Sequence, residues 1–125
     1  MEKILLSPST LAFVGDAYFG LLTRCKLAEV ERPIGELHSL SVKLVNANAQ
    51  EKGFLAIKEM LTEEETAVFK RGRNSHTKNT PKNSSVAAYH TATGLEALFG
   101  YLKISNREER AKELFDVIWA NVFEF

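Results

Sequence analysis

The chain has 125 residues, of which 45% are hydrophobic and 26% are charged, as in an ordinary globular protein. Sixteen basic residues balance sixteen acidic ones, so the formal net charge is zero and any footprint for a nucleic acid or a membrane must be local. These values exclude a disordered tail, a collagen-like fibre and a disulfide-stapled miniprotein, and they predict one domain over residues 1–125.

The N-terminal half of the chain predicts two amphipathic helices separated by a proline break. The first helix is expected over 9–24 and the second over 35–51, with the break at Arg32-Pro33. Gly53 is expected to end the second helix, and a short helix to follow over 54–60. The inward positions are Leu11, Val14, Tyr18, Leu21 and Leu22 in the first helix, and Leu37, Leu40, Leu44, Val45 and Ala47 in the second.

A capping box opens the next helix. Thr62 is spaced to cap this helix while Glu65 reaches back to the backbone of Thr62, and the helix is expected to end near Arg71-Gly72. A polar loop is expected over 73–83, followed by a helix over 85–103.

The C-terminal region predicts one more helix. Ser105 and Glu108 have the spacing of a second capping box, and the apolar positions that follow are Leu114, Val117, Ile118 and Val122. The chain shows no strict two-residue alternation and no hairpin turn pair, so the sequence predicts a compact all-α fold.

Two acids interrupt otherwise apolar helices. Asp16 and Glu96 each stand alone among apolar residues, with glycines a few positions away. A charge buried in such a setting costs several kcal/mol unless it is paired or bound to a cation. Both acids are therefore candidates to share Mg²⁺, with water and substrate phosphate completing its shell. The alternatives are that they face solvent or pair with Arg24 or Lys103.

A basic segment, residues 69–83, lies between the two acids in the sequence. Its cations are Lys70, Arg71, Arg73, Lys78 and Lys82, it contains no acid, and Asn74 is among its neutral donors. This mixture suits phosphate oxygens and sugar hydroxyls, and the lack of aromatic residues between Phe69 and Tyr89 favours a duplex over stacked single strands. A solvated surface loop is the alternative. Combined with two metal-binding acids, the segment indicates phosphodiester hydrolysis.

These motifs resemble a known family. Residues 11–17 look like the signature helix of the ribonuclease III catalytic domain, and residues 95–102 look like its second signature helix. Residues 70–74, followed by 80–83, are similar to one branch, the stand-alone bacterial Mini-ribonuclease III. The similarity extends to residues 29–50, including Pro33, Leu37, His38 and Gln50, and covers nearly the whole chain.

The resemblance implies a compact all-α homodimer that cleaves double-stranded RNA with Mg²⁺, leaves 5′-phosphates and matures the ends of 23S ribosomal RNA precursors. It makes Asp16 and Glu96 the catalytic and metal-binding residues. From the charge of the basic segment itself, we expect Lys70, Arg71, Arg73, Asn74, Lys78 and Lys82 to contact RNA phosphates. No appended double-stranded-RNA-binding domain is expected, so the catalytic domain must grip the duplex itself.

The chain also departs from the full-size enzymes of that family. Ser9, Ala12 and Thr93 stand where those enzymes carry further acids, a reduction that the Mini branch shares. His90 stands where the Mini branch often has arginine, and the sequence assigns no role to His90 or to His38.

Two other functions compete with a ribonuclease. One is an all-α nucleotide pyrophosphatase, which usually needs several acids at four-residue helical spacing; the helices that carry Asp16 and Glu96 lack them. The other is a non-catalytic helical RNA-binding or ribosome-assembly module. A nucleoside triphosphate and duplex RNA, each tested with Mg²⁺, would separate the three functions.

The chain shows no membrane or export signal. The apolar run 11–22 is too short to span a bilayer and has Asp16 at its centre. The single cysteine, Cys25, fits a reducing compartment. We therefore expect a cytoplasmic protein with no membrane partner.

Overall fold

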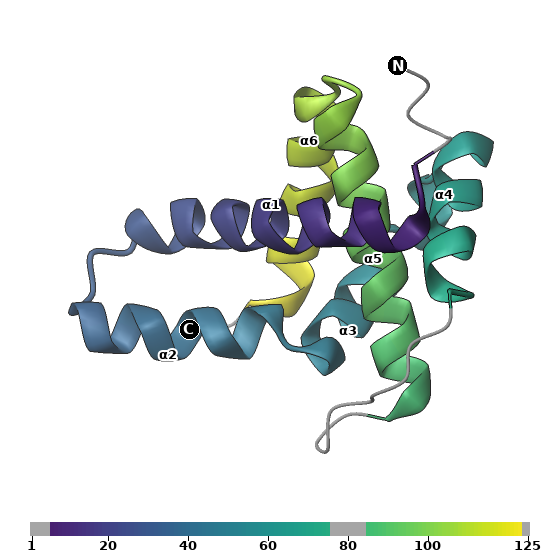
Figure 1. The fold of residues 1–125 in the computed structure, drawn as a ribbon. Helices are drawn as coiled ribbons and strands as arrows, with labels where there is room; N and C mark the ends of the chain where they lie inside the picture. Colours follow the sequence, from purple (N-terminus) through teal and green to yellow (C-terminus); the bar gives the residue numbers. More distant parts are fainter. Residues whose placement is uncertain (1–5, 76–84, 124–125) are drawn as a thin grey trace.

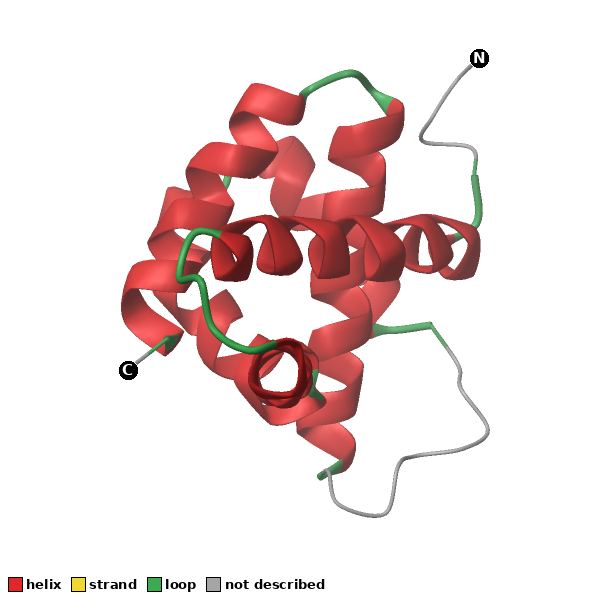
Figure 2. Ribbon diagram, turned by 90° about the vertical axis from the view of Figure 1, so that its left-hand side faces the viewer, coloured by secondary structure: helices red, strands yellow, loops and turns green. Residues whose placement is uncertain are grey.

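The fold is built from helices alone. A computed structural model describes residues 6–75 and 85–123, and within these residues it contains no strand (Figure 1, Figure 2). The all-α prediction is therefore confirmed. The helices are α1 (Pro8–Ala28), α2 (Ile34–Val45), α3 (Ala47–Ile57), the short 3₁₀ helix η2 (Lys58–Met60), α4 (Glu63–Arg73), α5 (Val86–Ile104) and α6 (Glu108–Val122).

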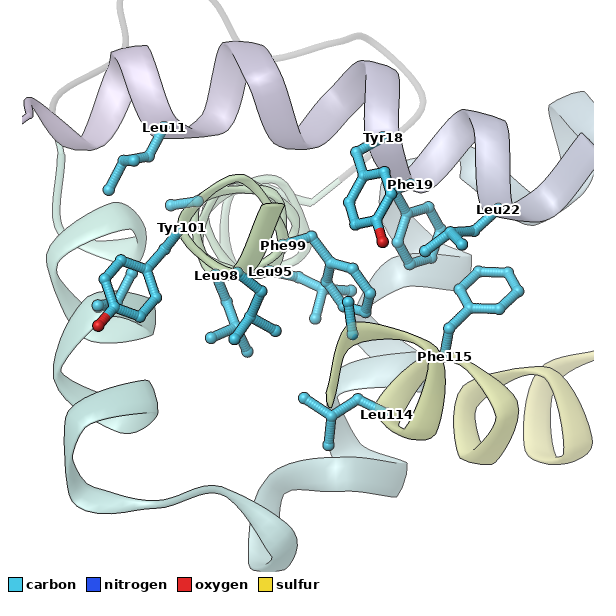
Figure 3. Packing of buried hydrophobic residues seen from close by; sticks show 14 of the residues in the cluster. Leu11, Tyr18, Phe19, Leu22, Leu95, Leu98, Phe99, Tyr101, Leu114 and Phe115 are labelled. Carbon is cyan, nitrogen blue, oxygen red and sulfur yellow. The ribbon is translucent and has the colours of Figure 1, made fainter. Parts of the chain in front are cut away.

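Helix α5 is the centre of the molecule. Helix α1 crosses it, and α3, α4 and α6 pack around its remaining sides (Figure 1). Leu95, Leu98 and Phe99 of α5 are fully buried, and they meet α6 through Leu114 and Phe115 (Figure 3). Each such side chain contributes about 1.5–3 kcal/mol when it leaves water. Residues on α5 are therefore held firmly relative to four other helices.

Aromatic rings connect α1, α5 and α6. The Phe19 ring makes edge contacts with Phe99, at 5.3 Å between centroids, and with Phe115, at 5.2 Å. Edge-to-face pairs of this kind are worth about 0.5–1.5 kcal/mol beyond the area they bury. Figure 3 shows Phe19, Phe99 and Phe115 converging beneath α1. The cluster fixes the rotation of α1, and with it the direction in which the other side chains of α1 point.

Two glycines allow α1 and α5 to touch along their backbones. A Cβ atom at Gly15 would lie 1.6 Å from the carbonyl oxygen of Glu96, and one at Gly100 would lie 1.9 Å from that of Leu11. Any side chain at either position would therefore push the helices apart. The close approach expected from the glycines is confirmed. It brings Asp16, the residue after Gly15, alongside the turn of α5 that carries Glu96.

A second close approach joins α4 to α5. A Cβ atom at Gly72 would lie 2.7 Å from the Cβ of Ala97, and one at Gly94 would lie 2.7 Å from the ring of Phe69. The C-terminal end of α4, which carries the first cations of the basic segment, is thereby fixed beside the same stretch of α5.

Most helix boundaries follow the expected caps. The Thr62 hydroxyl accepts a hydrogen bond from the Glu65 amide at 3.1 Å, and Glu65 accepts one from the Thr62 amide at 2.9 Å. This capping box is therefore confirmed. Ser85 caps α5 through the amide of Ala88, at 3.0 Å. The helices predicted at 62–72 and 85–103 correspond to α4 and α5.

The helix predicted over 35–51 is wrong, because the chain breaks within it. Helix α2 ends at Val45, and the Asn46 side chain accepts a hydrogen bond from the amide of Ala49 at 2.9 Å, so that it caps a separate helix, α3. An asparagine can close a helix in this way because its side chain competes with the backbone for donors. Gly53, expected to end a helix, lies inside α3, where a Cβ would meet Ile118 at 2.8 Å.

The second predicted capping box is also wrong. Ser105 ends α5, and α6 begins after Arg107 without a side-chain cap. Asn106 adopts the left-handed conformation, with φ 59°, and the Arg107 amide donates to the carbonyl of Leu102 at 2.8 Å. This is the hydrogen bond of a helix-ending turn. Ser105 therefore ends α5, although it was predicted to begin the helix that follows.

Two further observations concern surface residues. Leu21, expected to face inward, is 55% exposed on α1. Across residues 6–75 and 85–123, none of the helices combines the length and apolar character needed to cross a bilayer.

Candidate active site

The structure brings Asp16 and Glu96 together from opposite ends of the sequence. Glu96 is partly buried on α5, and Asp16 lies across from it on α1. Burial raises the pKa of Glu96, and the charge of Asp16 and a hydrogen bond between the two carboxyl groups raise it further, against a hydrogen bond from Gln50. The result is a pKa of about 7, compared with an ordinary value of 4.5. The pair is therefore an electrostatically unfavourable arrangement when both groups are ionised.

The two acids differ in exposure. Both were expected to be buried, but Asp16 is exposed, so only Glu96 is strongly desolvated. Among the described residues, neither acid forms an ion pair with Arg24 or Lys103; Lys103 instead contacts Glu108, at 3.3 Å. The expected alternative, in which the acids pair with Arg24 or Lys103, is therefore wrong. The other alternative, exposure to solvent, is correct for Asp16 but not for Glu96.

The side chain of Gln50 is a third member of the site. It is 2% exposed, and its Nε2 atom donates to Glu96 Oε2 at 3.2 Å and to the carbonyl oxygen of Val45 at 2.8 Å. Sequence reasoning missed this contact. Gln50 entered only through the family resemblance, and no local pattern indicates that a residue 46 positions away would bind Glu96.

An open cleft lies beside the acids. It has a volume of about 380 Å³ and runs between α1 and α2, where Asp16, Leu21 and Arg24 face Ser41 and Val45. Of the two acids only Asp16 lines this cleft, and its side chain is exposed, whereas Glu96 is partly buried and Gln50 is buried. A large substrate can therefore reach Asp16 from the exposed side of α1.

The first residues of the basic segment form the C-terminal end of α4. Lys70 and Asn74 are exposed, while Arg71 and Arg73 are partly buried. Arg73 lies over the ring of Phe69, at 5.8 Å, and Arg71 donates to the carbonyl oxygen of Leu6 at 3.3 Å. Cations at this end also complement the helix dipole. The other two predicted RNA-binding residues, Lys78 and Lys82, lie outside the described residues.

The carboxylate pair fits a hard divalent cation. Within the described parts of the chain, no group of three or more His, Cys, Asp or Glu side chains is arranged to hold a metal. Two carboxylates and an amide nevertheless suit Mg²⁺, which usually binds one or two carboxylates and keeps several waters. The Thr93 hydroxyl donates to the carbonyl oxygen of Tyr89 at 3.1 Å.

Comparison with known proteins identifies the fold of the chain and the class of enzyme to which it belongs. The sequence matches the ribonuclease III domain over residues 9–107. The chain belongs to the ribonuclease III family. It is accordingly a ribonuclease III-like endoribonuclease, which decides against both the pyrophosphatase and the non-catalytic module.

Individual relatives place the chain near one branch of the ribonuclease III family. A Mini-ribonuclease 3 from Thermoanaerobacter sp. (strain X514) is 43% identical over 113 residues, covering 90% of this chain and 80% of the relative. That of Staphylococcus aureus (strain NCTC 8325 / PS 47) is 35% identical over 117 residues, covering 91% and 87%. A crystal structure of a Fusobacterium nucleatum protein superposes with a TM-score of 0.85 at 31% identity, covering 91% of this chain and 92% of that one.

Proposed function

We propose that this chain cleaves double-stranded RNA with Mg²⁺ held by Asp16 and Glu96. The observation that carries the proposal is the apposition of the two carboxyl groups, with the pKa of Glu96 raised to about 7. A divalent cation favours the ionised form of both acids and offsets their repulsion. Ribonuclease III family membership supplies the reaction class.

The chain's own residues divide the work of hydrolysis. Asp16, at the open side, and Glu96, behind it, would hold the cation through carboxylate oxygens. The cation, when bound, would supply an activated water and charge compensation for in-line hydrolysis that leaves a 5′-phosphate. Gly15 and Gly100 keep the two helices close enough for both acids to act at one point.

Duplex binding is assigned to the basic segment. Lys70, Arg71, Arg73 and Asn74, at the end of α4, would contact phosphates and sugar hydroxyls, which carry no sequence information. Lys78 and Lys82 extend the same charge further along the chain. Because α4 packs on α5 at Gly72 and Gly94, these contacts would be held in register with the acids.

A homodimer completes the proposal. Phe13 is 80% exposed and Leu21 is 55% exposed on α1, and Val42 is 55% exposed on the neighbouring α2. Exposed apolar side chains gathered on adjacent helices favour a protein interface, and a second copy would present one active site to each strand of a duplex. Phe13→Ser should therefore yield a monomer in sedimentation equilibrium, whereas Leu55→Ser, which alters an exposed leucine on α3, should leave a dimer.

The physiological substrate is proposed from the family resemblance. We assign the chain to the maturation of 23S ribosomal RNA precursor ends, in the cytoplasm. A precursor transcript should be cut at its terminal duplex faster than an unrelated duplex of equal length. Equal rates on both would contradict a specific role in ribosomal RNA maturation.

The decisive experiment is incubation with long duplex RNA, read on a denaturing gel. Mg²⁺ should produce fragments with 5′-phosphates, and chelator should stop their formation. Asp16→Asn should bind the duplex and fold normally but leave it uncut. Turnover by this variant, or by the wild type in chelator, would refute the role of Asp16 or of the cation.

A further inference from the structure

The amide of Gln50 occupies an unusual position in the interior. Its Nε2 has two acceptors, Glu96 Oε2 and the carbonyl oxygen of Val45, whereas its Oε1 is buried and has no hydrogen-bond partner among the described residues. The orientation of the amide is well defined, because both neighbours can accept from nitrogen and the Val45 carbonyl cannot donate to oxygen. A buried acceptor without a partner destabilises a protein, so an apolar side chain of similar size would suit a purely structural position better.

The location of Gln50 explains what the amide can do. Val45 ends α2 and Asn46 caps α3, so Gln50 connects the corner between these helices to the carboxylate on α5. One amide hydrogen restrains Glu96 and the other anchors the amide itself to the backbone. The Oε1 atom belongs to the same planar group as Nε2, so the amide that contacts Glu96 also carries a buried acceptor without a partner among the described residues.

We propose that Gln50 is a positioning residue for the divalent cation, holding Glu96 in place through Nε2 and offering Oε1 to a water molecule that the cation retains. This inference rests on the proposed function, because it requires a cation at Asp16 and Glu96. Groups that orient metal ligands typically change metal affinity 10–100-fold when they are removed. Mg²⁺ keeps several waters when few protein ligands bind it, so an acceptor beside the ligands has a natural partner.

The first test is a direct measurement of cation binding. Gln50→Met keeps the length and volume of the side chain but removes the amide. Calorimetric titration of the RNA-free protein with Mn²⁺ should show affinity weakened about 10–100-fold, while Asn48→Ala, an exposed amide on the same helix, should match the wild type. Asp16→Asn serves as the variant that loses a ligand. Wild-type affinity in a folded Gln50→Met protein would overturn the inference.

Kinetics separate positioning from a general structural role. In Gln50→Met, the Mn²⁺ concentration for half-maximal cleavage should rise by the same factor as the dissociation constant, and the rate should recover at saturating Mn²⁺. A loss of rate that excess cation does not restore would overturn the inference. A wild type that neither binds Mn²⁺ nor cuts duplex RNA would instead refute the proposed function.

A second measurement needs no substitution at the site. Gln50 is the sole glutamine of the sequence, so glutamine-selective ¹⁵N labelling gives a single side-chain amide pair. Added Mg²⁺ should shift this pair with the midpoint of cation binding, and the shift should vanish in Asp16→Asn. An unchanged signal in wild-type protein saturated with Mg²⁺ would overturn the inference even if Gln50→Met failed to fold.

Discussion

Two glutamates of this chain are withdrawn from solvent in opposite surroundings. Glu65 is 3% exposed, and its carboxylate accepts hydrogen bonds from Nε and Nη2 of Arg110, each at 2.9 Å. Glu96 has the amide of Gln50 at 3.2 Å and a second acid, Asp16, as neighbours. The charge of Glu65 is matched by a guanidinium, whereas that of Glu96 is opposed by a like charge. The first arrangement stabilises the fold, and the second favours binding of a cation.

The pKa values of the two groups follow these surroundings. Burial alone would raise the pKa of Glu65, but hydrogen bonds from Arg110 and Thr62 and the charge of Arg110 outweigh it, so its pKa lies below the ordinary value. The same contact with Glu65, followed by that with Glu113, raises the pKa of Arg110. The pKa of Glu96 moves the other way, to about 7. A buried acid is therefore informative about function only when its partners are known.

The largest expected effect comes from removing the charge of Glu96. Glu96→Gln should lower the rate of duplex cleavage about a thousandfold, because loss of the proposed metal ligand would remove several kcal/mol of transition-state stabilisation. Single-turnover assays at saturating Mg²⁺ measure this loss. The control is Asp116→Asn, which alters an exposed acid on α6 that pairs with Lys26 of α1. This variant should cleave at the wild-type rate. Cleavage by Glu96→Gln at the wild-type rate would remove the distinction between the two glutamates.

The next effect concerns stability rather than activity. Arg110→Met should lower the free energy of unfolding by about 3–5 kcal/mol, because it leaves Glu65 buried without its cation. Urea denaturation checks the value. The matched control is Arg107→Met, which breaks the exposed pair with Glu64 and should cost about 1 kcal/mol or less. Equal losses in the two variants would show that burial of Glu65 adds nothing.

The two glutamates should also give the pH dependence of stability opposite signs. Between pH 4.5 and about 7, folded Glu96 holds a proton that the unfolded chain has released, so metal-free stability should fall as pH rises, by about 3 kcal/mol. The lowered pKa of Glu65 has the reverse effect, and its stabilisation is lost as pH falls below the ordinary value of 4.5.

Thermal unfolding in chelator, recorded from pH 4 to pH 8, tests both signs. Glu96→Gln should abolish the decline between pH 4.5 and 7 and leave the acid limb intact. Added Mg²⁺ should also counter the decline in wild-type protein, because the cation competes with the proton. A wild-type profile that rises through this window would contradict the raised pKa of Glu96.

The sequence predicted those parts of the fold that depend on local contacts. The capping box of Thr62 involves residues only three positions apart. The glycines near the two acids predicted the close backbone contact between α1 and α5. The break at Asn46 was not predictable from periodicity, because apolar spacing continues on both sides while the asparagine caps a new helix. Ser105 was wrongly predicted to open the last helix. The turn that ends α5 depends on the left-handed backbone of Asn106, which the spacing of Ser105 and Glu108 does not reveal.

The candidate site divides in the same way. An acid alone in an apolar helix is visible in the sequence, so the pairing of Asp16 with Glu96 could be expected, although their roles stay predictions. The contact of Gln50 with Glu96 could not be expected, because it depends on the direction that α3 takes after Asn46. Exposure of Leu21 was missed because a period of 3.6 residues does not reveal which edge of the stripe is covered.

The smallest expected effect concerns the end of α4, where we propose that charge serves RNA binding rather than chemistry. Replacing Arg71 and Arg73 by Gln should weaken duplex binding and reduce the slope of log affinity against log salt by about 1 to 2, one unit for each lost phosphate contact. Filter binding between 50 and 300 mM salt, with chelator present to prevent cleavage, measures both quantities. Lys58→Gln, an exposed cation on η2 outside the basic segment, is the control and should keep the wild-type slope. If the double variant kept that slope too, these arginines would be cations that cap α4, and duplex binding would have to be reassigned to other basic residues.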